Sequence, residues 1–389
     1  MNQKKIGLIC ACAVGFAYSC NYTNHAPLIP ILIQQFGFTK AMAGLLTTAM
    51  FFTHAAVQIP SGHLADKYGG RNIIGIGLMI VIAGNVGITF SNNYIALLLW
   101  KTFVGFGTGT SFIAGARYIS QLMPAKELPK AQGYFGASIL LGSGFVIFII
   151  PRIAQVSSWQ TAFLSTGSLA AFVLIIWFLL SPKPVPKGYS STKLSVLLLH
   201  PQLWVLGIVQ MASFGLVIVI GSWITLLLKQ QILIAKPLLI SFVASLVILI
   251  GVITRPVGGV LVTKIGARKL LQISFLLNTI GCLLLAYVGS SLLAALLAIV
   301  LLGIGCGLPY ATIFNRATVL FPGRAGAAKG LVNMIGVIMI MVGTPLVGYV
   351  VDSSGQFTNA FIALAGLSLV VFIISFSIKN NLDDNYLSI

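Results

Sequence analysis

The sequence predicts an all-α membrane protein with twelve transmembrane helices arranged as two six-helix repeats. Three observations predict this fold class: an apolar composition, twelve apolar runs of spanning length, and a motif pattern shared by the two halves. Of the 389 residues, 58% are hydrophobic and only 7% are charged, whereas soluble domains carry roughly 25% charged residues. A soluble fold of this length could not bury so much apolar surface, but a bilayer can accommodate it.

The apolar runs fall into two sets of six, separated by a polar stretch. A helix needs about 20 apolar residues to cross a membrane. The predicted spans lie near residues 6–32, 41–64, 72–91, 94–122, 131–151, 159–180, 201–228, 236–262, 268–289, 291–321, 326–351 and 356–378. We therefore expect an N-terminal bundle at 1–180, a cytoplasmic linker at 181–200 and a C-terminal bundle at 201–389. The segment Met1–Ile9 has no small-residue cleavage site before a soluble domain, so it is interpreted as the start of the first membrane helix.

The distribution of basic residues predicts the orientation. If both termini are cytoplasmic, the inside segments hold fifteen Lys and Arg residues and the outside segments hold four, as the positive-inside rule requires. The net charge of +18 comes from residues scattered between apolar runs, with no dense basic block that would bind nucleic acid. The short loops are typical of a bacterial inner membrane protein.

The two halves repeat with an offset of 197 or 198 residues. Glycine matches at one offset are easy to find by chance in a chain with 41 glycines, but four regions agree within one residue of offset. The matches are Gly62 with Gly259, Gly69 with Gly266, Arg71 with Arg268, Ala131 and Gly133 with Ala328 and Gly330, and Gly105-Phe-Gly107-Thr-Gly109 with Gly303-Ile-Gly305-Cys-Gly307. Two parallel six-helix repeats are a known transporter architecture, with the substrate site between the halves near the membrane midplane.

The loop after the second span reads Gly62-His-Leu-Ala-Asp66-Lys67-Tyr-Gly69-Gly70-Arg71. It resembles the signature loop of the major facilitator superfamily, and a weaker echo with Thr263 in place of the acid runs from Gly259. Helix count, central linker and both loop positions extend the resemblance over the whole chain. The resemblance implies a gating role for Gly62, Asp66, Gly69, Arg71 and Gly259, because glycines allow close helix approach and an acid in a turn can pair with basic residues or a helix N-terminus.

Three further motifs refine the resemblance. The fourth helix begins Lys101-Thr-Phe-Val-Gly105-Phe-Gly107, which is similar to the superfamily's Arg-x-x-x-Gly-x-Gly pattern with Lys for Arg. The fifth helix lacks the Gly-Pro pair of drug–proton antiporters, which argues against drug efflux. Arg255 in the eighth helix is similar to the substrate-binding Arg of monocarboxylate and nitrate/nitrite porters. The nitrate porters have a glycine-rich signature with an Asn in the fifth helix, and Ser143 stands near the place expected for that Asn, which argues against nitrate itself.

The intramembrane charges predict an anionic ligand. Ionisable groups inside a membrane cost a few kcal/mol each. The basic residues within spans are Lys101, Arg117, Arg255 and Arg316, and the five acidic residues of the chain are Asp66, Glu127, Asp352, Asp383 and Asp384. All five acids are predicted to lie in loops, at a helix end or in the C-terminal tail. A bound anion would supply the charge that the four bases lack.

Each base has a functional and a structural interpretation. Arg255 lies four residues before Gly259 on one helix face, so it either binds substrate or caps carbonyls near the inner gate. Arg117 and Arg316 occupy repeat-related helices expected to line the cavity, and they either form a two-sided anion clamp or extend to the cytoplasmic surface. Lys101 either contacts substrate or supports helix packing.

Uncharged polar residues extend the candidate substrate site. The first helix carries a stripe of Tyr18, Asn21, Tyr22 and His25, whose spacings of three and four place them on one face. The stripe either lines the cavity or makes interhelical hydrogen bonds, and His25 either carries a proton or stays neutral. His54 and Gln58 in the second helix and Gln210 in the seventh are weaker candidates, with packing as the alternative.

Nothing in the sequence predicts bond chemistry, a cofactor or a metal. The five cysteines lie in apolar runs without a Cys-x-x-Cys, and Gly105 to Gly109 lies in an apolar helix, where glycines indicate close packing rather than a phosphate loop. The predicted function is secondary transport by alternating access of a small organic anion or a zwitterion such as an amino acid, by a monomer. A co-transported proton or a counter-anion would drive it. Efflux of amphipathic compounds and a non-transporting membrane sensor are the alternatives.

Overall fold

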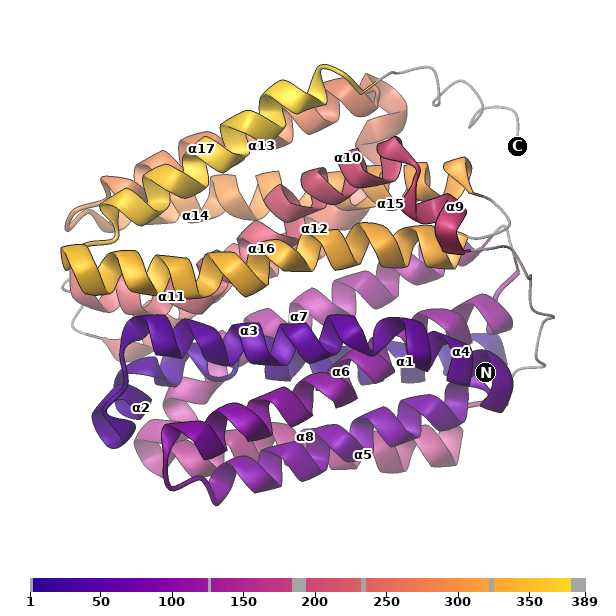
Figure 1. Ribbon diagram of the computed structural model, residues 1–389, viewed down its shortest axis with the longest axis horizontal. Helices are drawn as coiled ribbons and strands as arrows, with labels where there is room; N and C mark the ends of the chain where they lie inside the picture. Colours follow the sequence, from indigo (N-terminus) through magenta and orange to yellow (C-terminus); the bar gives the residue numbers. More distant parts are fainter. Residues whose placement is uncertain (1–2, 125–126, 184–193, 232–235, 322–324, 379–389) are drawn as a thin grey trace. The chain divides into compact units, whose positions relative to one another are not determined.

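The computed structural model describes residues 3–124, 127–183, 194–231, 236–321 and 325–378, and these residues form helices without any strand. The chain divides into two compact units, Met1–Tyr189 and Ser190–Ile389, which Figure 1 colours from indigo to yellow along the sequence. Among the described residues, ten helical stretches are long and apolar enough to cross a membrane. The predicted all-α membrane class is therefore confirmed.

The N-terminal unit follows the predicted spans closely but breaks two of them. Its elements are α1 (Gln3–Thr23), η1 (Ala26–Leu28), α2 (Ile29–Phe36), α3 (Lys40–Ala56), α4 (Gln58–Tyr68), α5 (Gly70–Thr89), α6 (Tyr94–Leu122), α7 (Leu128–Val156) and α8 (Trp159–Leu180). The first span changes from α-helix to the 3-10 turn η1 at Pro27, where a proline has no N–H for the helical hydrogen bond. It then continues to Gly37, which ends α2 in the left-handed conformation with φ 68°. The second span is interrupted at Val57, between α3 and α4.

The C-terminal unit contains the counterparts of these helices. Its elements are α9 (Leu194–Leu198), α10 (Pro201–Gln210), the π-helical turn η2 (Met211–Gly215), α11 (Leu216–Gln231), α12 (Pro237–Ile265), α13 (Ala267–Ala286), α14 (Leu292–Gly307), α15 (Pro309–Leu320), α16 (Ala325–Ser354) and α17 (Thr358–Ser375). The seventh span is interrupted by η2 and the tenth at Pro309. The short helix α9 lies in the predicted linker, of which residues 184–193 are outside the described part of the structure.

Four helices start with a side-chain cap. The capping oxygen accepts a hydrogen bond from the backbone N–H three residues later, which satisfies one of the donors that every helix start leaves unpaired. The pairs are Thr39 with Met42 at 3.2 Å, Asn93 with Ala96 at 2.9 Å, Ser158 with Thr161 at 3.1 Å, and Ser291 with Ala294 at 3.2 Å. These residues begin α3, α6, α8 and α14, so local sequence sets where these spans start.

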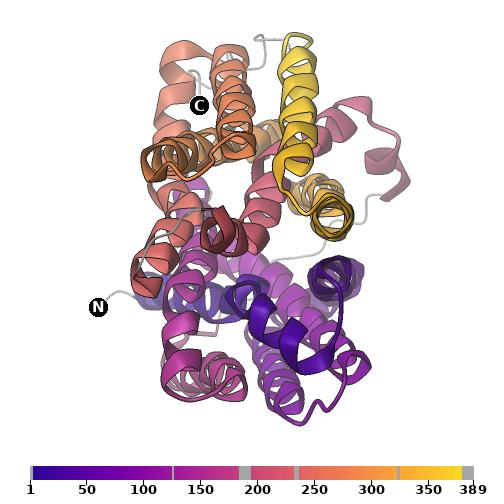
Figure 2. The same ribbon diagram turned by 90° about the vertical axis from the view of Figure 1, so that its left-hand side faces the viewer.

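The same helix pairs recur in the two units. In the first unit α5 packs on α6 and α8, α1 on α7, and α3 on α6; in the second α13 packs on α14 and α17, α10 on α16, and α12 on α14. Figure 1 shows these helices side by side within each unit, and Figure 2 gives the view turned by 90°. The two halves that match in sequence thus also pack their equivalent helices in the same pairs.

Equivalent arginines bond to the backbone just after the last helix of each unit. Arg71 Nε donates to the backbone oxygen of Ser181 at 3.1 Å, just after α8. Arg268 Nε donates to the backbone oxygen of Ile378 at 3.0 Å, just after α17. Each bond joins residues 110 positions apart, and each arginine follows shortly after a glycine with positive φ, Gly69 at 85° and Gly266 at 79°. The predicted repeat therefore extends to individual hydrogen bonds.

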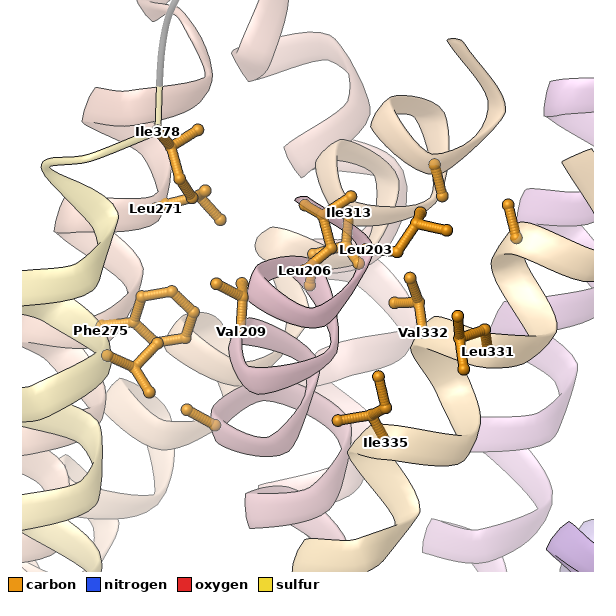
Figure 3. Close-up of a cluster of buried hydrophobic side chains, with 14 of the residues drawn as sticks. Leu203, Leu206, Val209, Leu271, Phe275, Ile313, Leu331, Val332, Ile335 and Ile378 are labelled. Atoms are coloured by element: carbon orange, nitrogen blue, oxygen red, sulfur yellow. The ribbon is translucent and has the colours of Figure 1, made fainter. Parts of the chain in front are cut away.

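The C-terminal unit has a cluster of buried apolar side chains between α10, α13, α15 and α16 (Figure 3). Leu203, Leu206 and Val209 of α10 lie at its centre, with Phe275 of α13 on one side and Ile335 of α16 on the other. All five side chains are at most 4% exposed. This packing holds α10, which leads directly into η2.

Candidate functional site

Arg255 is buried in α12 and stacked on an aromatic ring. Its side chain is 4% exposed, and the guanidinium carbon lies 4.0 Å from the ring centroid of Tyr310 in α15. The Tyr310 ring is held in turn by an edge contact with Phe314, with the centroids 4.7 Å apart. Stacking uses the face of the guanidinium, whereas its N–H donors point outward in the plane. The arrangement therefore fixes the plane in which Arg255 presents its donors.

The backbone around Arg255 is packed too closely for a larger residue. A Cβ on Gly258 would collide with the backbone oxygen of Leu308, at the junction of α14 and α15. A Cβ on Gly259 would lie 3.3 Å from the Cβ of Ala311, and one on Gly62 would meet only Ile113 at 3.7 Å. The closest approach is thus made by Gly258, which the sequence analysis did not single out, rather than by Gly62 or Gly259.

The other two predicted arginine ligands lie in different units. Arg316 in α15 is 3% exposed, and Arg117 in α6 is half-buried. Burial of Arg316 argues against its extending to a surface, which was one of the two interpretations. The two-sided clamp formed by Arg117 and Arg316 stays a prediction.

Lys101 in α6 is enclosed by neutral oxygens of the N-terminal unit. Its side chain is 0% exposed, and Nζ donates to the backbone oxygen of Asn21 and to Asn24 Oδ1, both at 3.0 Å. The ring of Phe163 lies 5.9 Å from Nζ. These contacts support the helix-packing interpretation of Lys101 over substrate contact.

A network of amides and a hydroxyl joins Lys101 in α6 to α1, α5 and α8. Asn85 Nδ2 donates to Asn21 Oδ1 at 2.7 Å, and Asn24 Nδ2 donates to Thr166 Oγ1 at 3.1 Å. Thr166 Oγ1 also lies 3.0 Å from Asn85 Oδ1. The sequence analysis missed Asn24, Asn85 and Thr166. Only Asn85 is a single polar residue in an apolar run, whereas Asn24 lies between Thr23 and His25 and Thr166 follows Ser165. The signal available was that buried polar side chains need partners, which an isolated residue in a spanning helix implies but does not identify.

The polar stripe of α1 divides between two environments. Asn21 joins the network around Lys101, whereas Tyr18 and Tyr22 belong to an aromatic cluster with ring centroids 6.0 Å apart. His25, just after α1, is 0% exposed and its Nε2 lies 2.7 Å from Thr47 Oγ1. Within the N-terminal unit the stripe thus makes interhelical hydrogen bonds at Asn21 and His25.

The aromatic cluster forms a closed ring of side chains from α1, α3, α6 and α7. Successive ring centroids lie between 5.5 and 6.5 Å apart in the order Tyr18, Tyr22, His54, Phe112 and Phe135, and back to Tyr18. His54 Nδ1 lies 3.1 Å from Thr108 Oγ1. The hydroxyl of Thr108 lies 3.1 Å from its acceptor, the backbone oxygen of Gly105, so His54 is fixed on α6 through its Nδ1 side.

Gln58 and Gln210 are both buried at interruptions of a span. Gln58 begins α4 directly after the break at Val57 and is 4% exposed. Gln210 ends α10 directly before η2 and is 1% exposed. Extra carbonyls become available where a helix is interrupted, and π-helical turns occur often at functional sites. The candidate role of both glutamines in substrate binding stays a prediction.

The turn η2 is tied to the interruption of the tenth span. Ser213 Oγ donates to the backbone oxygen of Cys306 at 2.7 Å, and Asn278 Nδ2 donates to the backbone oxygen of Ala212 at 2.9 Å. Both acceptors lie beside an irregular turn, where side-chain donors can satisfy carbonyls that the helix leaves free. Two interrupted spans of the C-terminal unit are therefore joined through side chains.

In the predicted gating loop, the structure describes the contacts of Arg71. Arg71 donates to the end of α8, to Ser181 Oγ at 2.9 Å and to the backbone oxygen of Phe178 at 2.5 Å. Trp177 Nε1 donates back to the backbone oxygen of Arg71 at 2.9 Å. The side chain of Asp66 lies outside the described part of the structure. Arg71 thus caps a helix C-terminus, where a cation is favourable, and the gating role of this loop stays a prediction.

Comparison with known proteins identifies related sequences over nearly the whole chain. The family described as Major Facilitator Superfamily matches residues 11–234 and 204–383. The probable nitrate transporter NarT of Staphylococcus haemolyticus is 23% identical over 90% of this chain and 90% of its own length. The nitrite extrusion protein of Bacillus subtilis is 23% identical over 89% and 88%, and the probable nitrate/nitrite antiporter NarK1 of Thermus thermophilus is 25% identical over 87% and 84%.

Proposed function

We propose that this chain, which belongs to the Major Facilitator Superfamily, transports a small inorganic anion of the nitrate or nitrite class and binds it through Arg255. The chain is an integral membrane protein and a secondary transporter, not an enzyme. The names of its relatives support the class of anion. The observation that carries the proposal within the structure is Arg255, a buried guanidinium whose plane is fixed by Tyr310.

The chemistry of a guanidinium suits a small planar oxyanion. Its N–H donors form a flat fork that can bond two oxygens of one anion at once. Charge-assisted hydrogen bonds of this kind are stronger in a site with little water. The 4.0 Å stacking of Arg255 on Tyr310 leaves this edge unused by the ring contact. A planar anion in the plane of the fork would therefore be favoured over a bulky one.

This substrate class replaces the carboxylate or amino acid expected from the sequence. All three relatives described above are named for nitrate or nitrite. The argument against nitrate rested on Ser143, whose Oγ donates to the backbone oxygen of Ser19 at 3.2 Å. Ser143 is 0% exposed and joins α7 to α1. It is the names of the relatives, rather than this residue, that favour nitrate or nitrite.

We further propose that transport proceeds by alternating access, as in other proteins built from six-helix repeats. A co-transported proton or a counter-anion would drive it, in a bacterial inner membrane with both termini in the cytoplasm. Arg117 and Arg316 remain candidates for further contacts with the anion. The sensor alternative predicts binding without flux, and the efflux alternative predicts binding of cationic amphiphiles.

The test combines binding and flux on the purified full-length protein. Thermal stability is measured with nitrate, nitrite, chloride, sulfate, acetate, alanine and a cationic amphiphile, and uptake of isotope-labelled nitrate is measured in proteoliposomes. A ligand that binds only the folded state stabilises it by about 2.7 kcal/mol at a concentration of 100 Kd. We expect nitrate or nitrite to stabilise the protein and to be transported.

The variant Arg255→Gln should lose both stabilisation by nitrate and nitrate uptake. The matched control is Arg152→Gln, because Arg152 lies exposed near the end of α7. The control should keep both activities. Stabilisation by the cationic amphiphile alone, or equal responses of the two variants, would refute the assignment of Arg255. Binding without uptake would favour the sensor.

A further inference from the structure

The ammonium group of Lys101 lies against the C-terminal end of a transmembrane helix. Its two acceptors are the backbone oxygen of Asn21, in the last turn of α1, and the side-chain oxygen of Asn24, one residue beyond that helix. The last carbonyls of a helix have no partner within it and carry the negative end of the helix dipole. Such an end is favourable for a cation, and here the cation is a side chain.

The two acceptors of Lys101 Nζ belong to a hydrogen-bonded network of neutral side chains from α1, the turn after it, α5 and α8. Asn21 Oδ1 lies 2.7 Å from the Asn85 amide nitrogen and 3.3 Å from that of Asn24. Thr166 Oγ1 lies 3.1 Å from the Asn24 amide nitrogen. All of these side chains are at most 3% exposed. The ammonium thus donates to two neutral oxygens that a buried network of amides and a hydroxyl holds in place.

Helix ends of this kind have a known use in transporter folds. Where a membrane helix is discontinuous, its C-terminal end and unwound carbonyls coordinate Na⁺ or a proton. The first span is discontinuous at this place, because α1 ends at Thr23 and the chain continues as the 3-10 turn η1. Hard cations prefer oxygen ligands, and neutral oxygens without a carboxylate suit a monovalent ion better than a divalent one.

We propose that the Lys101 ammonium occupies an alkali-cation site at the end of α1, so that this chain needs no Na⁺ or K⁺ there. The Lys101 side chain supplies permanently the positive charge that a bound ion would supply reversibly. Removing the ammonium while leaving the oxygens would uncover the site and make the protein responsive to a sodium-sized cation. This inference concerns the N-terminal unit alone and does not depend on which anion is transported.

The experiment measures thermal stability of the purified full-length variant Lys101→Ala without substrate. Sodium chloride is titrated against N-methyl-D-glucamine chloride at constant ionic strength, so that screening is the same throughout. We expect a saturable rise in the unfolding midpoint of Lys101→Ala with Na⁺, because an ion that binds only the folded state stabilises it. The midpoint of the wild-type protein should not change with the cation. Lys101→Ser, which shortens the side chain and adds an oxygen, should behave as Lys101→Ala does.

Two further variants separate cation binding from a general loss of stability. Lys101→Met fills the volume with an apolar chain and should show no response to Na⁺. Asn24→Ala added to Lys101→Ala removes one oxygen ligand and should require at least about tenfold more Na⁺, the ratio that corresponds to ~1.4 kcal/mol of binding free energy. The proposal is overturned if neither short variant yields folded protein that responds to Na⁺, if Lys101→Met responds equally, or if the wild type responds. Failure of nitrate transport would leave these stability measurements unaffected.

Discussion

The glycines of α6 allow a test of whether the Gly-x-Gly-x-Gly segment serves close packing. A Cβ on Gly107 would lie 2.6 Å from the backbone oxygen of Gly77 and 2.7 Å from the backbone nitrogen of Val81, both in α5. Non-bonded carbon atoms need about 3.5 Å, so Gly107→Ala would force α5 and α6 apart by several tenths of an ångström. A Cβ on Gly133 in α7 would meet nothing within 4 Å, so Gly133→Ala is the matched control.

Overpacking a buried position costs about 1–3 kcal/mol, and the upper part of that range applies here because the blocking atoms are backbone. Both variants gain the same ~1 kcal/mol of helix propensity from Gly to Ala, which cancels in their comparison. We therefore expect Gly107→Ala to unfold about 2–3 kcal/mol more easily than Gly133→Ala. The assay is unfolding in mixed micelles with increasing dodecyl sulfate, followed by tryptophan fluorescence. Equal midpoints for the two variants would refute the packing argument.

Two further predictions concern hydrogen bonds that join parts of the C-terminal unit. Arg268→Gln should lower the free energy of unfolding by about 1–2 kcal/mol, because it removes a charge-assisted bond to the backbone of Ile378 at a half-buried position. The control Lys269→Gln, at the exposed neighbouring residue, should change this free energy by less than ~0.5 kcal/mol. Equal effects of the two variants in the same micelle assay would contradict the capping role of Arg268. Ser213→Ala should cost about 1–3 kcal/mol because the buried carbonyl of Cys306 loses its donor, and an unchanged midpoint together with unchanged hydrogen exchange of η2 would argue against that bond.

Hydropathy and the internal repeat predicted the fold because both depend on many residues at once. The sixth span was predicted at 159–180 and the fourth at 94–122, and the structure has α8 and α6 over these ranges. The interruptions were not predicted, because a proline such as Pro27 or Pro309 is tolerated in some spanning helices and breaks others. Which outcome occurs depends on neighbouring helices that satisfy the freed backbone groups.

The candidate site was predictable only in part, because a polar residue in a span does not reveal its partner. Arg255 was identified from its motif, and its burial agrees with a ligand role. Lys101 was weighed as a ligand because no acid lies in the spans, but its Nζ donates to the backbone oxygen of Asn21 and the side-chain oxygen of Asn24. Neutral acceptors leave no signal in a count of charges, so that count alone did not identify the acceptors of Lys101.

The hydrogen bonds from Arg71 and Arg268 also limit the order in which the two units can finish folding during synthesis. While the chain is being synthesised, Arg71 has no acceptors at the end of α8 until residues as far as Ser181 have been made. After that point the first unit, Met1–Tyr189, contains every residue of its own closing bonds, and domains generally fold as units with the N-terminal one first. The second unit cannot form its own closing bond until Ile378 has been made. A chain whose synthesis stops between Ser181 and Ile378 would thus contain the residues for the closing bonds of the first unit but not for that of the second.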